Sequence, residues 1–259
     1  MGELVDLVDK VRKYYKFSPA EWRSILITIF VLAFIIHFGQ TIPDADVLTT
    51  TAFSVYNFII AVIVVAISFM WHLSAKKIAA LHVGFRAQYN LWTFGILISL
   101  VVTFISLAWG RPVWVLFAGG VMLQHLAGHR LGFFRYGLNY YEAGWISMIG
   151  PISSIVLAAI FKALSGILPS VFVLKAITFN LLFAFWNALP IPPLDGSRMM
   201  FGSRMVYALS FFFVLAAVIL LWIDIPIWIA LVGSVLIGLL GWILYYIFIE
   251  RGFWHGPYP

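Results

Sequence analysis

One acidic residue stands at the end of an apolar run, in the segment WNALPIPPLDGSRM at residues 186 to 199. Three prolines precede it, and prolines break a helix and leave backbone groups that need partners from protein or water. This pattern predicts a lined cavity at the end of a membrane helix. A carboxylate is costly there, so Asp195 is a candidate functional residue. The simpler alternative is that Asp195 caps a turn at the membrane interface beside Gly196.

Two histidines with the spacing of metal ligands, His125 and His129, form the segment HLAGH. Residues i and i+4 share one face of a helix, where two imidazoles could hold zinc. The glycine between them and the strand-like residues around them favour two loop histidines instead, and no carboxylate is adjacent. This pair is therefore a weaker metal candidate than Asp195.

The residues around Asp195 resemble a motif of the site-2 protease family, whose members are intramembrane zinc metalloproteases. The motif reads Asn-x-x-Pro-x-x-x-Leu-Asp-Gly. The positions that match or suit it are Asn187, Pro190, Pro192, Pro193, Leu194, Asp195 and Gly196. The resemblance implies that Asp195 is the third zinc ligand. It also implies two histidine ligands and a catalytic glutamate, in an H-E-x-x-H motif on an earlier membrane helix.

The stretch that resembles the zinc-motif helix begins at His72 and ends at Gly84. Aligned on that glycine, His72 takes the place of the first histidine ligand. Leu73 stands at the catalytic glutamate position, and Lys76 stands at the position of the second histidine. Leucine cannot transfer a proton, and an ammonium has no lone pair for a metal. The resemblance therefore implies a degenerate site in which His72 and Asp195 are the remnant ligands.

Helical spacing places His72 and Lys76 on one face, directed to where Asp195 is expected. We therefore expect the Lys76 ammonium to replace zinc as the positive partner of the Asp195 carboxylate. In the alternative, Lys76 extends to the lipid headgroups together with Lys77 and never meets Asp195.

Two further stretches extend the resemblance to residues 50 to 200. One is Gly-Gly-Val at residues 119 to 121, which is similar to a strand of the family. The other is Gly150-Pro151, which is similar to the start of a family helix. The family usually has an asparagine a few residues after that proline, where this chain has two serines.

The composition excludes a water-soluble globule. Of the 259 residues, 63% are hydrophobic and 10% are charged, and the mean hydropathy is +1.03. This leaves too little polar surface to face water. The net charge of +6 is spread over loops, which favours topology control and attraction to anionic lipid over nucleic-acid binding. Because the chain has no cysteine, disulfides, thiolate metal sites and cysteine catalysis are excluded.

Apolar runs long enough to cross a bilayer predict the scaffold. Full spans are expected at 22 to 41, 51 to 72, 143 to 165, 170 to 189, 205 to 223 and 226 to 249. A further run at 91 to 109 is interpreted as a re-entrant segment. If His72 and Asp195 lie on the same side of the membrane, an even number of full spans must separate them, so this run has to return to its starting side.

The remaining segments give a three-part division. Residues 1 to 21 predict a basic amphipathic helix on the membrane surface, residues 22 to 249 a single transmembrane domain, and residues 250 to 259 a C-terminal tail. Residues 111 to 141 mix β-branched and aromatic residues with glycines, which predicts short strands or a hairpin at the interface. Basic residues before the first span predict a cytoplasmic N-terminus.

The fold expected is an all-α polytopic membrane protein with about six spans and a short interfacial β-hairpin. The function expected is that of a pseudoprotease, which binds membrane-spanning segments without cutting them and needs no cofactor. One alternative is an active intramembrane zinc metalloprotease that uses His72, Asp195 and a histidine of the hairpin. A second alternative is a structural or transport protein. The expected partners are the lipid bilayer and a single-span membrane protein or peptide, and not nucleic acid.

Overall fold

The computed structural model describes residues 2–38, 54–109, 113–126 and 139–251. Within these residues, six helices are long and apolar enough to cross a membrane, which confirms the polytopic all-α architecture. They are α2 (Pro19–His37), α4 (Val55–Val83), α7 (Tyr140–Ala163), α8 (Ser170–Ala188), α10 (Arg204–Trp222) and α11 (Ile227–Tyr245), the last continued by the short η1 (Tyr246–Glu250). The side of the membrane that faces the cytoplasm remains a prediction.

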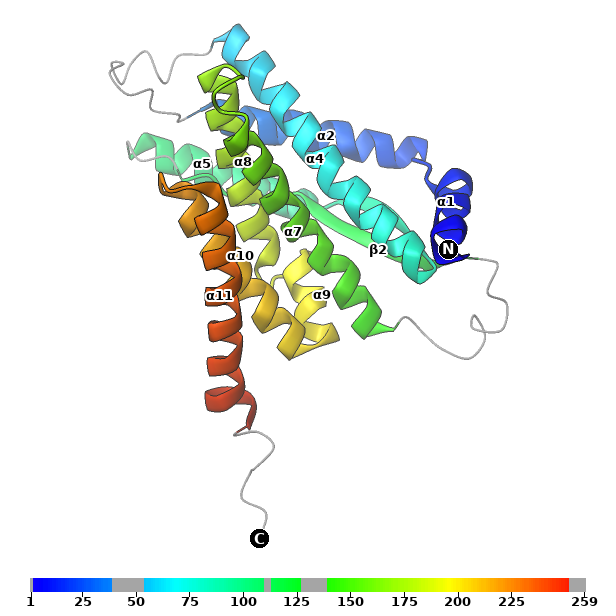
Figure 1. Ribbon diagram of the computed structural model, residues 1–259. Coiled ribbons are helices and arrows are strands. Elements are labelled where there is room, and N and C mark those ends of the chain that lie inside the picture. The colour runs from blue at the N-terminus through cyan, green and yellow to red at the C-terminus, as the bar shows by residue number, and fades with distance from the viewer. Residues whose placement is uncertain (1, 39–53, 110–112, 127–138, 252–259) are drawn as a thin grey trace.

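The helices pack around α7, which contacts α4, α8, α9 and α10. Figure 1 shows α7, α8 and α10 close together, with α11 at the edge of the bundle beside α10. Short α9 (Asp195–Gly202) lies between α7 and α10. The central position of α7 places its small residues, among them Gly150 and Ser154, against the polar groups of its neighbours.

Helix α4 continues past the apolar run at 51 to 72. It ends at Val83, and Gly84 then takes a left-handed conformation with φ 101°, at the glycine where the resemblance to the zinc-motif helix implies the helix end. Glycine adopts this conformation without a steric penalty, which explains its place at the helix end. The extra turns carry Lys76 and Lys77, and both are buried within the protein.

The small sheet has one strand inside the segment where a hairpin was expected and one outside it. Strand β1 (Phe85–Leu91) pairs with β2 (Gly119–His125) in antiparallel register, from Phe85 opposite His125 to Leu91 opposite Gly119. Helix α5 (Thr93–Ala108) joins them. The hairpin assigned to residues 111 to 141 is thus corrected: its partner strand comes earlier in the chain, and residues 127 to 138 lie outside the described part.

The segment from β1 to β2 begins and ends next to the C-terminus of α4. The backbone N–H of Leu126 donates to the carbonyl of Gly84 at 3.2 Å, directly where α4 ends. Helix α5 has 16 residues and falls short of the six candidate spans in length. Between His72 and Asp195 the described residues therefore contain two candidate spans, α7 and α8, and the even number that the sequence argument requires is met.

The N-terminal region forms helix α1 (Gly2–Tyr14), and α2 begins at Pro19. Ser18 caps α2 by accepting a hydrogen bond from the N–H of Glu21 at 3.2 Å. The Tyr15 hydroxyl lies 2.7 Å from Ser74 Oγ and joins this region to α4. The position of α1 on the membrane surface stays a prediction, and residues 252 to 259 of the predicted tail lie outside the described part.

Candidate functional site

The candidate site forms where α4, α7 and the start of α9 meet. Asp195 is the first residue of α9, and its side chain is 1% exposed. Two of the motif residues around it have structural roles: Asn187 donates to the carbonyl of Phe183 at 2.8 Å, and Gly196 lies so close to the carbonyls of Ala188 and Leu189 that a side chain would collide with them. The motif therefore presses the α8–α9 turn against the end of α8.

The other matched residues lie on the same turn. Pro190 is exposed, Pro193 is half-buried and Leu194 is buried immediately before Asp195. The carbonyl of Pro193 occupies the space that a side chain at Gly120 would need, so the turn also packs on β2. The Gly-Gly pair of β2 and the proline turn, far apart in the sequence, thus form one packed unit next to Asp195.

Lys76 meets Asp195, as the shared helix face of His72 and Lys76 predicts. The Lys76 ammonium donates to Oδ1 of Asp195, and both side chains are almost completely buried. Burial alone would raise the pKa of the Asp195 carboxyl, but the charge of Lys76 and the close contact with His72 lower it to about 2. Asp195 is therefore an anion held by a cation, and Lys76 does not extend to the headgroups.

His72 lies between Asp195 and α7. Its Nε2 is 3.3 Å from Oδ2 of Asp195, and its Nδ1 is 3.0 Å from the hydroxyl of Ser154. Ser154 stands in the stretch where the family has an asparagine. The ring also contacts Phe183 edge-on, with 4.9 Å between centroids. Contacts at both ring nitrogens and with the Phe183 ring therefore determine the orientation of the imidazole.

Gly150 makes this arrangement sterically feasible. A Cβ atom at this position would lie 2.7 Å from Oδ2 of Asp195 and 2.7 Å from Cε1 of His72. Pro151 follows it inside α7, and a proline inside a helix removes one backbone donor. The Gly-Pro pair thus opens room for the two polar side chains at the centre of a helix interface.

The residues present do not fit a catalytic zinc ion. Such a site needs three protein ligands and a water, but among the described residues at this site only His72 and Asp195 are histidine or carboxylate ligands, and the third position holds the Lys76 ammonium. In the described part of the chain, no group of three or more His, Cys, Asp or Glu side chains could hold a metal. The electrostatic need of Asp195 for a positive partner is met by lysine.

The hairpin histidines do not complete the ligand set in the described residues. His125 lies at the end of β2, opposite Phe85 and with its ring 4.6 Å from the ring of that residue. That position is beyond the end of α4, and the rise from His72 to Gly84 is about 18 Å at about 1.5 Å per residue. His129 lies outside the described part.

No carboxylate other than Asp195 lies at this site among the described residues. Leu73, at the glutamate position, is 2% exposed and belongs to the hydrophobic core. Among the described residues the buried carboxylates are Asp195 and Glu21. Glu21 binds Lys77, with its two oxygens 2.8 and 2.9 Å from the Lys77 Nζ.

The Lys77–Glu21 pair is a feature that sequence reasoning missed. The alternative for Lys76 would take Lys77 to the headgroups as well, but Lys77 binds Glu21, and its Nζ also lies 3.8 Å from the centre of the Phe17 ring. Glu21 in addition accepts the backbone N–H of Tyr89 at 2.9 Å. One carboxylate on α2 thus connects α4 and β1, and so fixes the sheet next to the Lys76–Asp195 pair.

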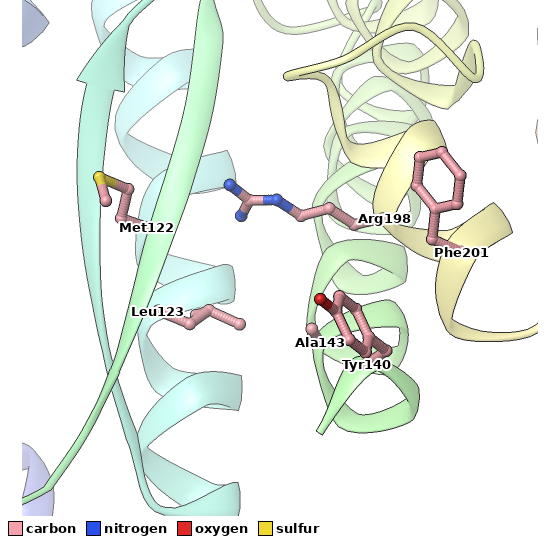
Figure 2. Close-up of a pocket in the computed structure, with 6 residues that line it drawn as sticks. All are labelled: Met122, Leu123, Tyr140, Ala143, Arg198 and Phe201. Carbon is pink, nitrogen blue, oxygen red and sulfur yellow. The ribbon is translucent and has the colours of Figure 1, made fainter. Parts of the chain in front are cut away.

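A cavity of about 250 Å³ lies beside the site, between β2, α7 and α9. Arg198, one helical turn after Asp195, extends into it, as Figure 2 shows. No sequence pattern indicated this cavity, because its walls come from three separate segments. They are formed by Met122, Leu123, Tyr140, Ala143, Arg198 and Phe201.

No family model matches the chain, and no solved structure does. One curated protein does: a Methanocaldococcus jannaschii protein described as a "putative zinc metalloprotease" is 25% identical over 191 residues, which are 72% of this chain and 86% of the relative. The similarity to a zinc metalloprotease is in line with the resemblance of the motif around Asp195. The chain is a multi-pass membrane protein that resembles a zinc metalloprotease.

Proposed function

We propose that this chain is a site-2-protease-like pseudoprotease, which binds segments of partner membrane proteins and does not hydrolyse them. The observation that carries the proposal is the Lys76–Asp195 ion pair. An ammonium occupies the place where the family resemblance implies a metal ligand, and it neutralises the carboxylate that would otherwise attract a cation.

Peptide hydrolysis needs an activated water and a group that accepts its proton. At this site Asp195 is held by Lys76 and His72, and its low pKa makes it a poor proton acceptor near neutral pH. Leu73 supplies no carboxylate at the base position. The residues can hold charge and orient helices, but they cannot generate a hydroxide.

Binding is supported by the open edge of β2. The backbone N–H of Leu126 donates to Gly84, and that of Trp92 donates to Ala118. These two bonds show which facing residues of β1 and β2 form hydrogen-bonded pairs. By the alternation of an antiparallel ladder, Val121 and Leu123 direct their backbone groups away from β1. No third strand pairs with β2 among the described residues. An extended partner segment can therefore form backbone hydrogen bonds along this edge.

Zinc content tests the catalytic half of the proposal. The wild-type protein, purified in detergent and washed without chelator, should contain far less than one zinc per chain. Lys76→His restores a third donor beside His72 and Asp195, so this variant should take up about one zinc per chain, consistent with a three-ligand site. Lys76→His combined with Asp195→Ala should lose it again and serves as the matched control.

A model peptide tests the binding half. A single-span peptide reconstituted with the wild-type protein in nanodiscs should bind and remain intact by mass spectrometry. Near-stoichiometric zinc in the wild type, lost in Asp195→Ala, together with cleavage of the peptide, would instead establish an active metalloprotease. Absence of any bound peptide would refute the binding role.

A further inference from the structure

Among the described residues that line the cavity beside the Lys76–Asp195 pair, Arg198 carries the charge and the others are apolar apart from the hydroxyl of Tyr140. Arg198 projects from α9 towards the strands, and Figure 2 shows its guanidinium in the space between α9, α7 and β2. Leu123 points towards it from β2, Met122 also lines the cavity, and Ala143 lines the α7 side. A guanidinium in such surroundings is stable only if an anion or water compensates for lost hydration.

In the described part of the chain, no acidic residue is paired with Arg198. Burial lowers the pKa of the guanidinium, and the nearby charge of Asp195 counteracts this. Yet Asp195 directs Oδ1 to Lys76 and Oδ2 to His72, and no acid forms an ion pair with Arg198 among the residues that the structure describes. Within the described residues this guanidinium thus has no ion-pair partner, and a guanidinium carries five N–H donors that a ligand can use.

We propose that this cavity binds a carboxylate of an extended peptide segment that lies along the edge of β2, and that Arg198 is the residue that selects it. The inference rests on the proposed binding function and adds to it the class of ligand. A carboxylate matches the planar fork of arginine with two parallel hydrogen bonds.

The size and position of the cavity favour a peptide side chain over a phospholipid. Its volume of about 250 Å³ lies below the range of about 300 to 1,000 Å³ typical of small-molecule sites, so it accommodates an aspartate or glutamate rather than a headgroup with two acyl chains. Leu123 lines the cavity and also directs its backbone to the open strand edge. A segment paired with β2 thus brings a neighbouring side chain within reach of Arg198.

Paired peptides test this inference. Single-span peptides that carry one glutamate at successive positions next to the membrane segment, and glutamine twins of each, are titrated against the protein in phosphatidylcholine nanodiscs. At the best position the wild type should bind the glutamate peptide about tenfold more tightly than its twin, as expected for a desolvated charge pair. Arg198→Gln should remove this preference, and Arg198→Lys should retain part of it.

Arg86→Gln is the matched control, because it removes an equal charge from β1 at an exposed position that does not line the cavity. It should retain the wild-type preference. Thermal unfolding of each variant shows whether the fold is kept, and Arg198→Gln should still bind both peptides equally.

The outcomes separate the two proposals. If the wild type binds both twins equally at every position, or if the glutamate preference survives in Arg198→Gln, the carboxylate site is refuted while the binding function stands. If neither peptide binds, both proposals fail. A lipid site would give a different pair of results. Phosphatidylglycerol in the nanodisc would abolish the preference for the glutamate peptide, and native mass spectrometry would find bound phosphatidylglycerol only on proteins that have Arg198. Together these results would overturn the peptide inference.

Discussion

Lys76 and Asp195 form a buried ion pair between two helices, although 119 residues separate them in the sequence. The pair joins α4 to α9, and the His72 ring lies on the remaining carboxylate oxygen. Because neither charge reaches solvent, each depends on the other for compensation. This dependence gives the site measurable properties that differ from those of a metal centre.

Removing the ammonium alone should destabilise the protein. Lys76→Met leaves the Asp195 carboxylate buried with only His72 beside it, so we expect a loss of about 3 to 5 kcal/mol in the free energy of unfolding. Reversible denaturant unfolding in mixed micelles measures it. The double variant Lys76→Met/Asp195→Leu should recover most of the loss, because it removes both charges. Strictly additive effects of the two substitutions would contradict a direct pair.

Acid should weaken the protein through Asp195 only at low pH. The folded pKa of this carboxyl is about 2, below its ordinary value of 3.8. Since the folded pKa is the lower one, the stabilisation is fully present above pH 4 and is lost as the pH falls towards 2. Unfolding followed from pH 6 to pH 2 should show a steeper decline in the wild type than in Asp195→Asn. Equal slopes would show that Asp195 is not held as an anion.

A methyl group at Gly150 should separate His72 from Asp195. Gly150→Ala places a Cβ within 2.7 Å of both side chains, so we expect a loss of about 1 to 3 kcal/mol from overpacking, although alanine favours the helix by about 1 kcal/mol. Thermal unfolding in detergent measures the difference. Gly166→Ala is the control, because a Cβ there meets nothing within 4 Å and should leave the unfolding temperature nearly unchanged. A loss of the same size at both positions would argue against the steric explanation.

Glu21 should hold the sheet to the helices. Glu21→Gln removes the anionic partner of the buried Lys77 ammonium, and we expect a loss of about 3 kcal/mol in the free energy of unfolding. Hydrogen exchange should also become faster at the Tyr89 amide, whose N–H donates a hydrogen bond to Glu21. Hydrogen exchange read by mass spectrometry resolves this strand. Asp6→Asn, which breaks the exposed pair of Asp6 and Lys10, is the matched comparison and should change stability by less than about 1 kcal/mol. Unchanged exchange at Tyr89 in Glu21→Gln would show that the carboxylate is dispensable.

The candidate site was predictable where a short-range pattern determines it. Helical spacing put His72 and Lys76 on one face, and the proline-rich turn marked Asp195. The span lengths followed from apolar runs, because lipid requires them. Each of these signals lies within one segment, so the sequence carries it directly.

Other features depend on pairings between distant segments. The Lys77–Glu21 contact spans 56 residues, and a single sequence gives no reason to choose that partner. Strand β1 did carry a signal: Phe85, Ala87 and Tyr89 are buried and alternate with more polar neighbours, which is the period of a half-buried strand. No strand was predicted for this segment.

The hydrogen bond from Leu126 to Gly84 has an evolutionary consequence. Because the chain leaves α4 and comes back to the same residue, the segment between them forms a closed detour. Residues can be gained or lost inside such a detour without turning any later helix upside down in the bilayer. Natural variation in partner preference can therefore accumulate in β1, α5 and β2, while the helices that carry Lys76 and Asp195 keep their orientation.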